Sequence, residues 1–395
     1  MVKSILSISL ILLSLSCSKD KDDNVIKQGI IENRPKIEIN TNTQKNLDFS
    51  DIVSLKLDTA LHFSVAICEN LQEQLNTIKE KGHYKGLSIA VGIPNNGFWR
   101  STIGESGTEI PLTTETKIHA LSMGKIFTSV LTLKLIEEGY LNINETINKW
   151  FPECPRANEI TINHLLSHTS GIQTHEVLYE FVLNDKNNYS EEEMVEMAFQ
   201  YKIPEVPNSF LSYSNTGYIM LGIIIREVTG KSLKENFNNY LINPLGLKNT
   251  VYCDKENLNM DNIRGYNGDE ISDCKQWPLT YAEGPFISTP TDIIILYNYI
   301  LSGQFLTSKS MDLMLSEMNI WKYQPDTYYG KGIYLIKGLN SDNYLGHSGG
   351  HASFRTCVFY NIEKKVFVSV FSNTNAFEIE PAMFNITEKI IELIE

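Results

Sequence analysis

The most strand-like segments of this chain lie near its two ends, with helical patterns between them. Residues 86–104 (GLSIAVGIPNNGFWRSTIG) predict two strands joined by an Asn96-Gly97 turn, which is the strongest short-range signal for a hairpin. Residues 354–373 predict a second hairpin, whereas helical patterns dominate residues 160–250. Because the hairpins flank the helical region, we expect a mixed α/β (α+β) fold interrupted by an all-α insertion.

The same patterns place the domain boundaries. The hairpins and their neighbouring segments define an α/β part at about residues 66–135 and 275–395, and the all-α insertion occupies about residues 136–274. Residues 66–395 thus form one expected domain, which is long enough to bury a large core. Helical patterns also cover residues 66–81, 121–139 and 381–395.

Charge narrows the classes of partner. The 395 residues contain 34 Lys and Arg against 47 Asp and Glu, which gives a formal net charge of −13. Nucleic acid is therefore not an expected partner, because its phosphate backbone is bound by basic surfaces.

The N-terminus resembles a bacterial lipoprotein signal. Lys3 precedes an apolar run (SILSISLILLSLS) that is too short to span a bilayer as a helix, and Cys17 follows directly. In this interpretation residues 1–16 are the signal peptide, and residues 17–65 are a polar tether that begins with lipidated Cys17. The protein would then be lipid-anchored in the bacterial cell envelope, facing the periplasm or the surface. The alternative is an ordinary signal peptide with an incidental cysteine.

The remaining cysteines indicate neither a zinc site nor a disulfide framework, because their number is odd and none has CxxC spacing. Cys253 and Cys274 could pair in an oxidising compartment, but buried free thiols fit the sequence equally well. The set is Cys68, Cys154, Cys253, Cys274 and Cys357.

Ser122 and Lys125 head an otherwise apolar segment, LSMGKIFTSVLTLKLIEEG. Residues three apart share one face of a helix, so the two polar ends can meet. Serine is a weak nucleophile without a base, and lysine serves as that base only when burial lowers its pKa from ~10.4 by about 3 units. Ser-x-x-Lys occurs four times in the sequence, but only Ser122 heads an apolar helix. Without other support, an N-cap serine beside a snorkelling lysine explains the pattern as well.

Two further segments support a catalytic site. Tyr213-Ser214-Asn215 offers a phenol and an amide immediately before a helical pattern. The phenol can relay protons beside a neutral lysine, and the amide can hold a substrate carbonyl or the lysine. His347-Ser348-Gly349-Gly350 enters a β-rich run, where small residues let a substrate backbone lie along the strand edge with the Gly350 N–H free to donate.

Together these segments resemble the serine β-lactamase and penicillin-binding protein family, in particular its class C β-lactamase, D,D-peptidase and esterase branch. The resemblance runs from about Gly86 to the C-terminus. It implies a β-lactamase/transpeptidase-like fold, in which helices flank an antiparallel sheet. Four more segments carry it in the family's order: ITINHLLSHTSGI (160–172), YSNTGYIMLGIIIREVTGKSL (213–233), NPLGLKNT (243–250) and EGPFISTPTDI (283–293).

The resemblance also implies a role for each motif residue. Ser122 would be the acylated nucleophile, Lys125 its base, and Tyr213 the proton relay for the leaving group. The N–H groups of Ser122 and Gly350 would form the oxyanion hole. Neither a metal nor a cofactor is implied. The motif residues expected to contact the substrate are Asn215, His347, Ser348 and Gly349.

One position departs from the family. Where β-lactamases carry Lys-Thr-Gly, this chain has His347-Ser348-Gly349, and a histidine with a reference pKa of ~6.5 is mostly uncharged at neutral pH. The lysine helps to hold the carboxylate of a penicillin or a peptide. We therefore expect a serine hydrolase that acts through an acyl-enzyme on small esters, amides or D-amino-acid peptides. A true class C-like β-lactamase and a penicillin-recognising sensor without turnover are the alternatives.

Two other patterns are set aside. Residues 346–350 (GHSGG) match the Gly-x-Ser-x-Gly nucleophile elbow, but an elbow needs a helix after it and a strand pattern follows here. His164 and His168 are four apart, as zinc ligands on a helix can be. The sequence contains no HExxH, however, and we expect structural roles for both histidines.

Overall fold

The computed structural model describes the chain from Leu57 onward, with gaps. The predicted signal peptide, lipidated Cys17 and most of the tether lie outside the described residues, and so does Cys274 of the possible Cys253–Cys274 pair. The residues described are 57–106, 110–175, 189–201, 203, 206–254, 264–272, 279–284, 286–315, 322–324, 326–339, 342–351, 353–374 and 379–394.

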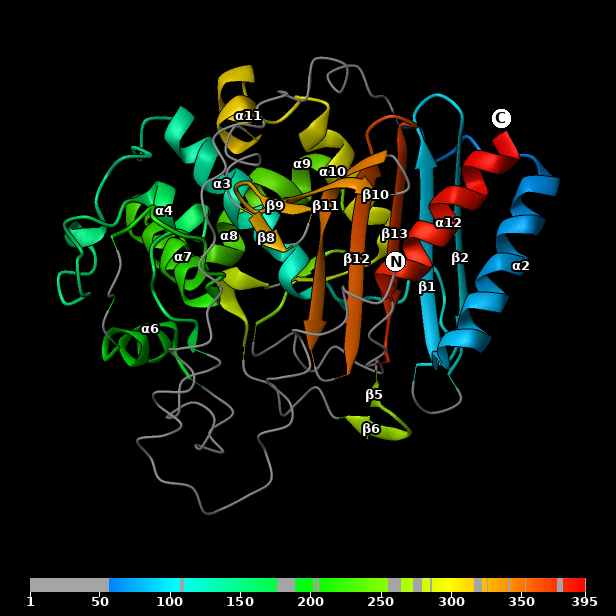
Figure 1. The fold of residues 1–395 in the computed structure, drawn as a ribbon, viewed down its shortest axis with the longest axis horizontal. Helices are drawn as coiled ribbons and strands as arrows, with labels where there is room; N and C mark the ends of the chain where they lie inside the picture. The colour runs from blue at the N-terminus through cyan, green and yellow to red at the C-terminus, as the bar shows by residue number, and fades with distance from the viewer. Residues whose placement is uncertain are drawn as a thin grey trace.

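An eight-stranded antiparallel sheet forms the centre of the fold (Figure 1). Its strand order, β2-β1-β13-β12-β11-β10-β9-β8, places the first hairpin of the chain beside the last one. The predicted antiparallel sheet is thus confirmed. The strands are β1 (Gly86–Ile93), β2 (Gly97–Gly104), β8 (Lys322–Gln324), β9 (Thr327–Tyr329), β10 (Tyr334–Leu339), β11 (Asp342–His351), β12 (Phe354–Asn361) and β13 (Val366–Ser372).

Both predicted hairpins are present in this sheet. β1 and β2 pair as far as Ile93 with Gly97, and the turn between them holds Asn95 at φ 60°. Asparagine tolerates this left-handed conformation, which explains why the chain reverses there. β12 and β13 form the second hairpin, and β13 also pairs with β1 along its other edge.

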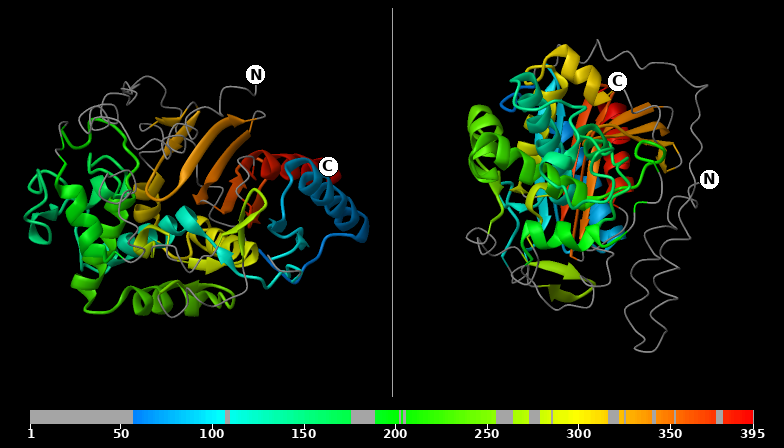
Figure 2. Two further views of the ribbon diagram at one scale, coloured as in Figure 1. Left: turned by 90° about the horizontal axis from the view of Figure 1, so that it is seen from below. Right: turned by 90° about the vertical axis from the view of Figure 1, so that its left-hand side faces the viewer.

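Helices cover both faces of the sheet because alternate residues of its central strands point to opposite sides and both sets are apolar. Ile89 of β1 and Val368 of β13 share a core with α2 (Val65–Gly82) and α12 (Ile379–Ile394). Phe371 of β13 joins the other core, to which the central helices contribute. Figure 2 shows the blue α2 beside the red α12, which agrees with the contacts between these two helices. They correspond to the predicted first and last helices.

The described chain between β2 and β7 is mainly helical. Its centre is α7 (Asn215–Thr229), in which every residue from Asn215 to Ile225 is buried, and which packs against α3, α4 and α6. No helix in the described ranges is long and apolar enough to cross a membrane. The other helices are α3 (Lys125–Glu137), α4 (Ile162–Leu166), α6 (Glu191–Phe199), α8 (Leu233–Phe237), α9 (Asn243–Leu245), α10 (Pro290–Leu301) and α11 (Ser308–Leu315), and the short strands are β3 (Ile118–His119), β4 (Val251–Tyr252), β5 (Gly265–Asn267), β6 (Glu270–Ser272) and β7 (Phe286–Ser288).

The helix predicted to start at residue 121 begins differently. Leu121–Gly124 form a 3₁₀ turn (η2), and the α-helix α3 starts at Lys125. Every residue of α3 from Lys125 to Leu133 is buried. A helix that is buried all round lies inside a core, so the first turn of α3 is enclosed by protein.

Two hydrogen bonds from different sheets fix the chain immediately before Ser122. The Ala120 N–H donates to the Phe286 carbonyl of β7 (2.8 Å), and the Ala120 carbonyl accepts from Thr356 Oγ1 of β12 (3.0 Å). Thr356 is fully buried. The central sheet therefore holds η2 directly, rather than through the helical region.

Replacing Thr356 by valine should lower the free energy of unfolding by about 1–3 kcal/mol, because a buried carbonyl that loses its donor is costly. Urea unfolding measures the change. Thr387→Val is the matched control, since Thr387 is also buried but donates to Met383 O (3.0 Å) within α12. The control should lose clearly less, because that carbonyl belongs to a helix ladder. Equal losses in the two variants would show that the bond to Ala120 has no special weight.

Candidate active site

Ser122 lies in η2, immediately after a strained residue. Leu121 has φ 54°, a left-handed conformation that costs a non-glycine residue roughly 1–3 kcal/mol and that occurs in turns and at functional sites. Two glycines leave room for this turn. A Cβ at Gly284 would lie 2.7 Å from the Leu121 carbonyl oxygen, and one at Gly349 would lie 2.9 Å from the Ala120 carbonyl oxygen. Both positions therefore require glycine.

Lys125 is fully buried, with 0% of its surface exposed. Its Nζ donates to Ser122 Oγ (3.1 Å) and to the Glu283 carbonyl (2.9 Å). The same Nζ lies 5.0 Å from the centre of the Tyr213 ring and 5.5 Å from that of Tyr218. The structure thus brings the predicted serine and lysine together in a dry, aromatic environment.

Tyr213 approaches the pair from the helical region. It precedes α7, whose N-terminus is capped by Ser214 Oγ, which accepts from the Gly217 N–H (3.2 Å). Burial raises the pKa of Tyr213 well above its usual value, and a hydrogen bond with the Ser122 side chain offsets part of this rise. The phenol is therefore protonated at neutral pH and can donate or accept beside Ser122. Asn215, the next motif residue, is the first residue of α7 and is buried.

Strand β11 presents an open edge beside η2. β10 pairs with β11 only as far as Gly346, whereas β12 pairs with it through His351. On the β10 side, residues 347–351 therefore have no strand partner among the described residues, and β11 packs against η2. Ser348, Gly349 and Gly350 all lie on this stretch, next to the Ser122 turn.

His347 is held as a neutral ring. Its Nδ1 lies 2.6 Å from the Ser348 carbonyl, which can only accept, so Nδ1 carries the proton and donates. Nε2 is then the acceptor for the Tyr329 hydroxyl (3.4 Å). Burial, and to a lesser degree the charge of Lys125, lowers the pKa of His347 to about 3. The ring is thus uncharged throughout the neutral range, as the sequence predicted for this position.

His168 lies in the site, although the sequence predicted only a structural role for it. Its Nδ1 accepts the Ser214 N–H (3.1 Å), and its ring packs against the rings of Tyr213 (4.2 Å between centroids) and Tyr329 (4.6 Å). Burial lowers the pKa of His168 well below its usual value, so the ring is neutral. It therefore fixes both the backbone and the ring of the Tyr213 segment. His164 is separate, since its Nδ1 accepts the Thr161 N–H (3.1 Å) at the start of α4.

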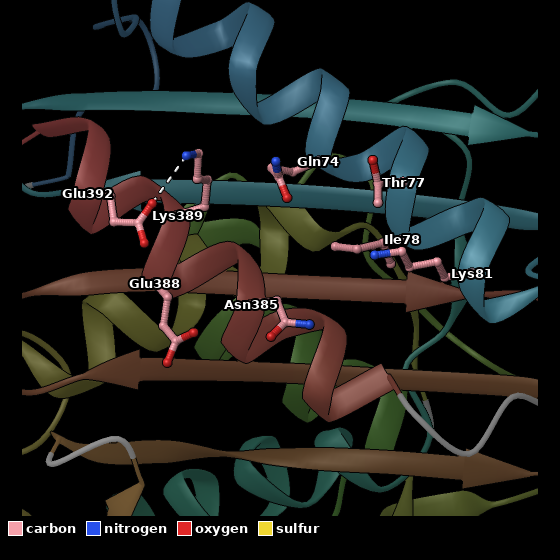
Figure 3. A pocket seen from close by; sticks show the side chains of 8 residues that line it. All are labelled: Gln74, Thr77, Ile78, Lys81, Asn385, Glu388, Lys389 and Glu392. Carbon is pink, nitrogen blue, oxygen red and sulfur yellow. Dashed lines mark hydrogen bonds and ion pairs between the residues drawn. The ribbon is translucent and has the colours of Figure 1, made fainter.

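A pocket of about 340 Å³ lies elsewhere, between α2 and α12 (Figure 3). Lys389 and Glu392 form an ion pair in it (3.1 Å). None of the candidate site residues lines it. The lining residues are Gln74, Thr77, Ile78, Lys81, Asn385, Glu388, Lys389 and Glu392.

A buried lysine hydrogen-bonded to a serine, at the start of the buried helix α3 and beside an open strand edge, is the arrangement of a serine-type hydrolase. The family model described as beta-lactamase matches residues 70–384. The chain therefore belongs to the β-lactamase family, as the resemblance of its motifs predicted.

Comparisons with individual proteins agree with this assignment. Penicillin-binding protein 4 of Amycolatopsis lactamdurans is 24% identical over 309 residues, which cover 72% of this chain and 80% of that protein. The structure of D-amino acid amidase from Ochrobactrum anthropi SV3 complexed with D-phenylalanine superposes with a TM-score of 0.73 at 24% identity, covering 83% of this chain and 99% of the amidase. A D-stereospecific amidohydrolase from Streptomyces sp. gives a TM-score of 0.68 at 20% identity, covering 82% and 97%. These likenesses confirm the predicted fold.

The buried neutral His347 should make stability depend on pH. Its pKa is about 3 in the folded protein and 6.5 without the fold, so between these values the unfolded state binds more protons. The contribution of His347 to the free energy of unfolding therefore falls as pH drops from about 6.5 toward about 3. Urea unfolding at pH 7 and pH 5 should show the wild type losing about 2 kcal/mol more than His347→Gln. Equal losses in the two proteins would contradict a neutral, buried His347.

Proposed function

We propose that the protein cleaves small amides and esters through an acyl-enzyme on Ser122. The observation that carries the proposal is the 3.1 Å contact between Lys125 Nζ and Ser122 Oγ, made by a lysine with no exposed surface. Burial disfavours the charged ammonium, and a neutral amine can accept the serine proton.

The proposed first half-reaction uses the three polar side chains in turn. The Lys125 amine takes the hydroxyl proton as Ser122 Oγ attacks the substrate carbonyl, and the N–H groups of Ser122 and Gly350 donate to the oxyanion that forms. Tyr213 then gives its phenolic proton to the leaving group as the bond to that group breaks, and it recovers a proton from Lys125. Water attacks the acyl-enzyme in the second half-reaction by the same steps reversed, which releases the acid and restores Ser122.

His347 supports a substrate class that lacks a carboxylate next to the scissile bond. The ring is fully buried and neutral, and both of its nitrogens are engaged, so it offers no positive charge to a carboxylate. A carboxylate at that place would lose its hydration without a counter-charge. Neutral leaving groups, such as the ammonia of a primary amide or an alcohol, avoid this cost.

Among substrates without such a carboxylate, the names of similar proteins favour derivatives of D-amino acids. Two of the similar structures are a D-amino acid amidase and a D-stereospecific amidohydrolase. We therefore propose D-amino-acid amides as the substrates, ahead of β-lactams and of peptides with a free carboxylate next to the scissile bond.

Ser122→Ala should lower kcat/KM for p-nitrophenyl acetate and for D-phenylalanine amide by roughly 10³-fold or more, because both reactions need the same nucleophile. Release of p-nitrophenolate and of ammonia measures the two activities. The wild type should prefer the D-amide over the L-amide, and it should turn over a chromogenic cephalosporin far more slowly than the ester.

Ser272→Ala is the matched control, because it removes the serine of another Ser-x-x-Lys match, in β6. This variant should keep wild-type activity. Activity that survives Ser122→Ala would refute the mechanism, whereas fast cephalosporin turnover would refute the substrate class argued from His347.

A further inference from the structure

Four aromatic rings form a closed group beside the nucleophile. Tyr213 lies 5.7 Å from Tyr323, Tyr323 lies 5.5 Å from Tyr334, Tyr334 lies 4.2 Å from His347, and His347 lies 6.4 Å from Tyr213, all measured between ring centroids. We call these residues the aromatic quartet. They come from the loop before α7 and from strands β8, β10 and β11, so the quartet spans the two sides of the site.

The quartet is uncharged at neutral pH. Burial raises the pKa of Tyr213 and of Tyr323 and lowers that of His347. Among the described residues, the charged groups near the quartet include Lys125 and Glu283. Lys125 Nζ lies 5.0 Å from the centre of the Tyr213 ring, and the Glu283 carboxylate acts on Tyr213 only through space. A ligand that contacts the quartet therefore meets apolar ring faces and neutral hydroxyls rather than a fixed charge.

Tyr323 is the most exposed of the three quartet residues that lie on strands. His347 is fully buried and Tyr334 is 8% exposed, whereas Tyr323 is only partly buried. One face of the Tyr323 ring stacks on Tyr334, with 15° between the ring planes. Tyr323 also lies on β8, the outermost strand of the sheet on this side. The ring of Tyr323 thus continues the stack formed by His347 and Tyr334. It also lies next to the ring of Tyr213, which is hydrogen-bonded to Ser122.

We propose that Tyr323 is a specificity-determining residue that stacks on a flat aromatic group of the substrate held at Ser122. The inference rests on the proposed function, because it assumes that the substrate carbonyl reaches Ser122 Oγ. Aromatic pairs gain from offset or edge-to-face contact in addition to the area they bury, and Tyr323 already makes such a contact with Tyr334. Small aliphatic groups would gain less binding free energy against this ring, and a carboxylate would lose its hydration without compensation.

Inhibition by boronic acids tests this without a choice of substrate. The Ser122 hydroxyl adds to boron, so one B–O bond forms and the proton passes to the Lys125 amine, which leaves the organic group where an acyl group would lie. The ratio of inhibition constants for methylboronic and phenylboronic acid should be large in the wild type. This ratio should fall roughly tenfold in Tyr323→Leu. It should stay at the wild-type value in Tyr323→Phe, which keeps the flat ring.

Tyr328→Leu is the matched control on the neighbouring strand β9. Tyr328 is partly buried too, but its ring lies under Lys337 Nζ (4.7 Å) and it joins the other core. This variant should keep the wild-type ratio. Equal weakening of both boronic acids by Tyr323→Leu would overturn the proposal, because it would reveal a general effect on the fold.

Failure of both boronic acids to inhibit the wild type would refute the nucleophile of the proposed function. The role of Tyr323 is then decided by calorimetry on Ser122→Ala, which cannot be acylated. Tighter binding of D-phenylalanine than of D-alanine, lost when Tyr323→Leu is added, would support the proposal. Equal binding of the two amino acids, or a preference unchanged by Tyr323→Leu, would overturn it.

Discussion

The site depends on the burial of a single amine. Lys125 Nζ is enclosed at the first turn of α3, where it bonds both Ser122 Oγ and the Glu283 carbonyl. An ammonium placed there loses its hydration, and this cost of burial is the physical basis of the proposed role of Lys125 as the base for Ser122. Where the lysine is charged, it opposes protonation of the histidines around it, and its charge adds to burial in lowering the pKa values of His168 and His347. The protonation states of Lys125, His168 and His347 are therefore linked.

The rest of the fold holds the backbone around that amine. Thr356 reaches from the central sheet to the Ala120 carbonyl, and the Phe286 carbonyl accepts the Ala120 N–H from the other side. Gly349 and Gly284 give the space in which the strained Leu121 can precede Ser122. The fold tolerates this backbone strain because strands from both ends of the chain fix the turn. A turn held in this way keeps the Ser122 side chain oriented before a substrate binds.

Local patterns predicted the parts of the molecule that local sequence controls. The hairpins at both ends follow from runs of apolar, strand-favouring residues, and the Ser122–Lys125 contact follows from the spacing of the two residues. The turn of the first hairpin precedes the predicted Asn96-Gly97 pair, since Asn95 has φ 60° and Gly97 begins β2. The helix start was predicted four residues early, because the left-handed Leu121 and the 3₁₀ turn depend on glycines that are distant in sequence. His168, the Glu283 carbonyl and the aromatic quartet are long-range contacts without a local signal. The likeness of residues 160–172 and 283–293 to the family was the only hint of His168 and Glu283, and none of the segments that carried the resemblance contains Tyr323 or Tyr334.

Acid-quench mass spectrometry tests the central claim most directly. The protein is mixed with p-nitrophenyl acetate, stopped within one turnover and digested, so that any covalent intermediate is located on a peptide. We expect the mass of one acetyl group on the peptide that contains Ser122, and none in Ser122→Ala. An acetyl group on another residue, or turnover with no acylated peptide in the wild type, would contradict an acyl-enzyme on Ser122.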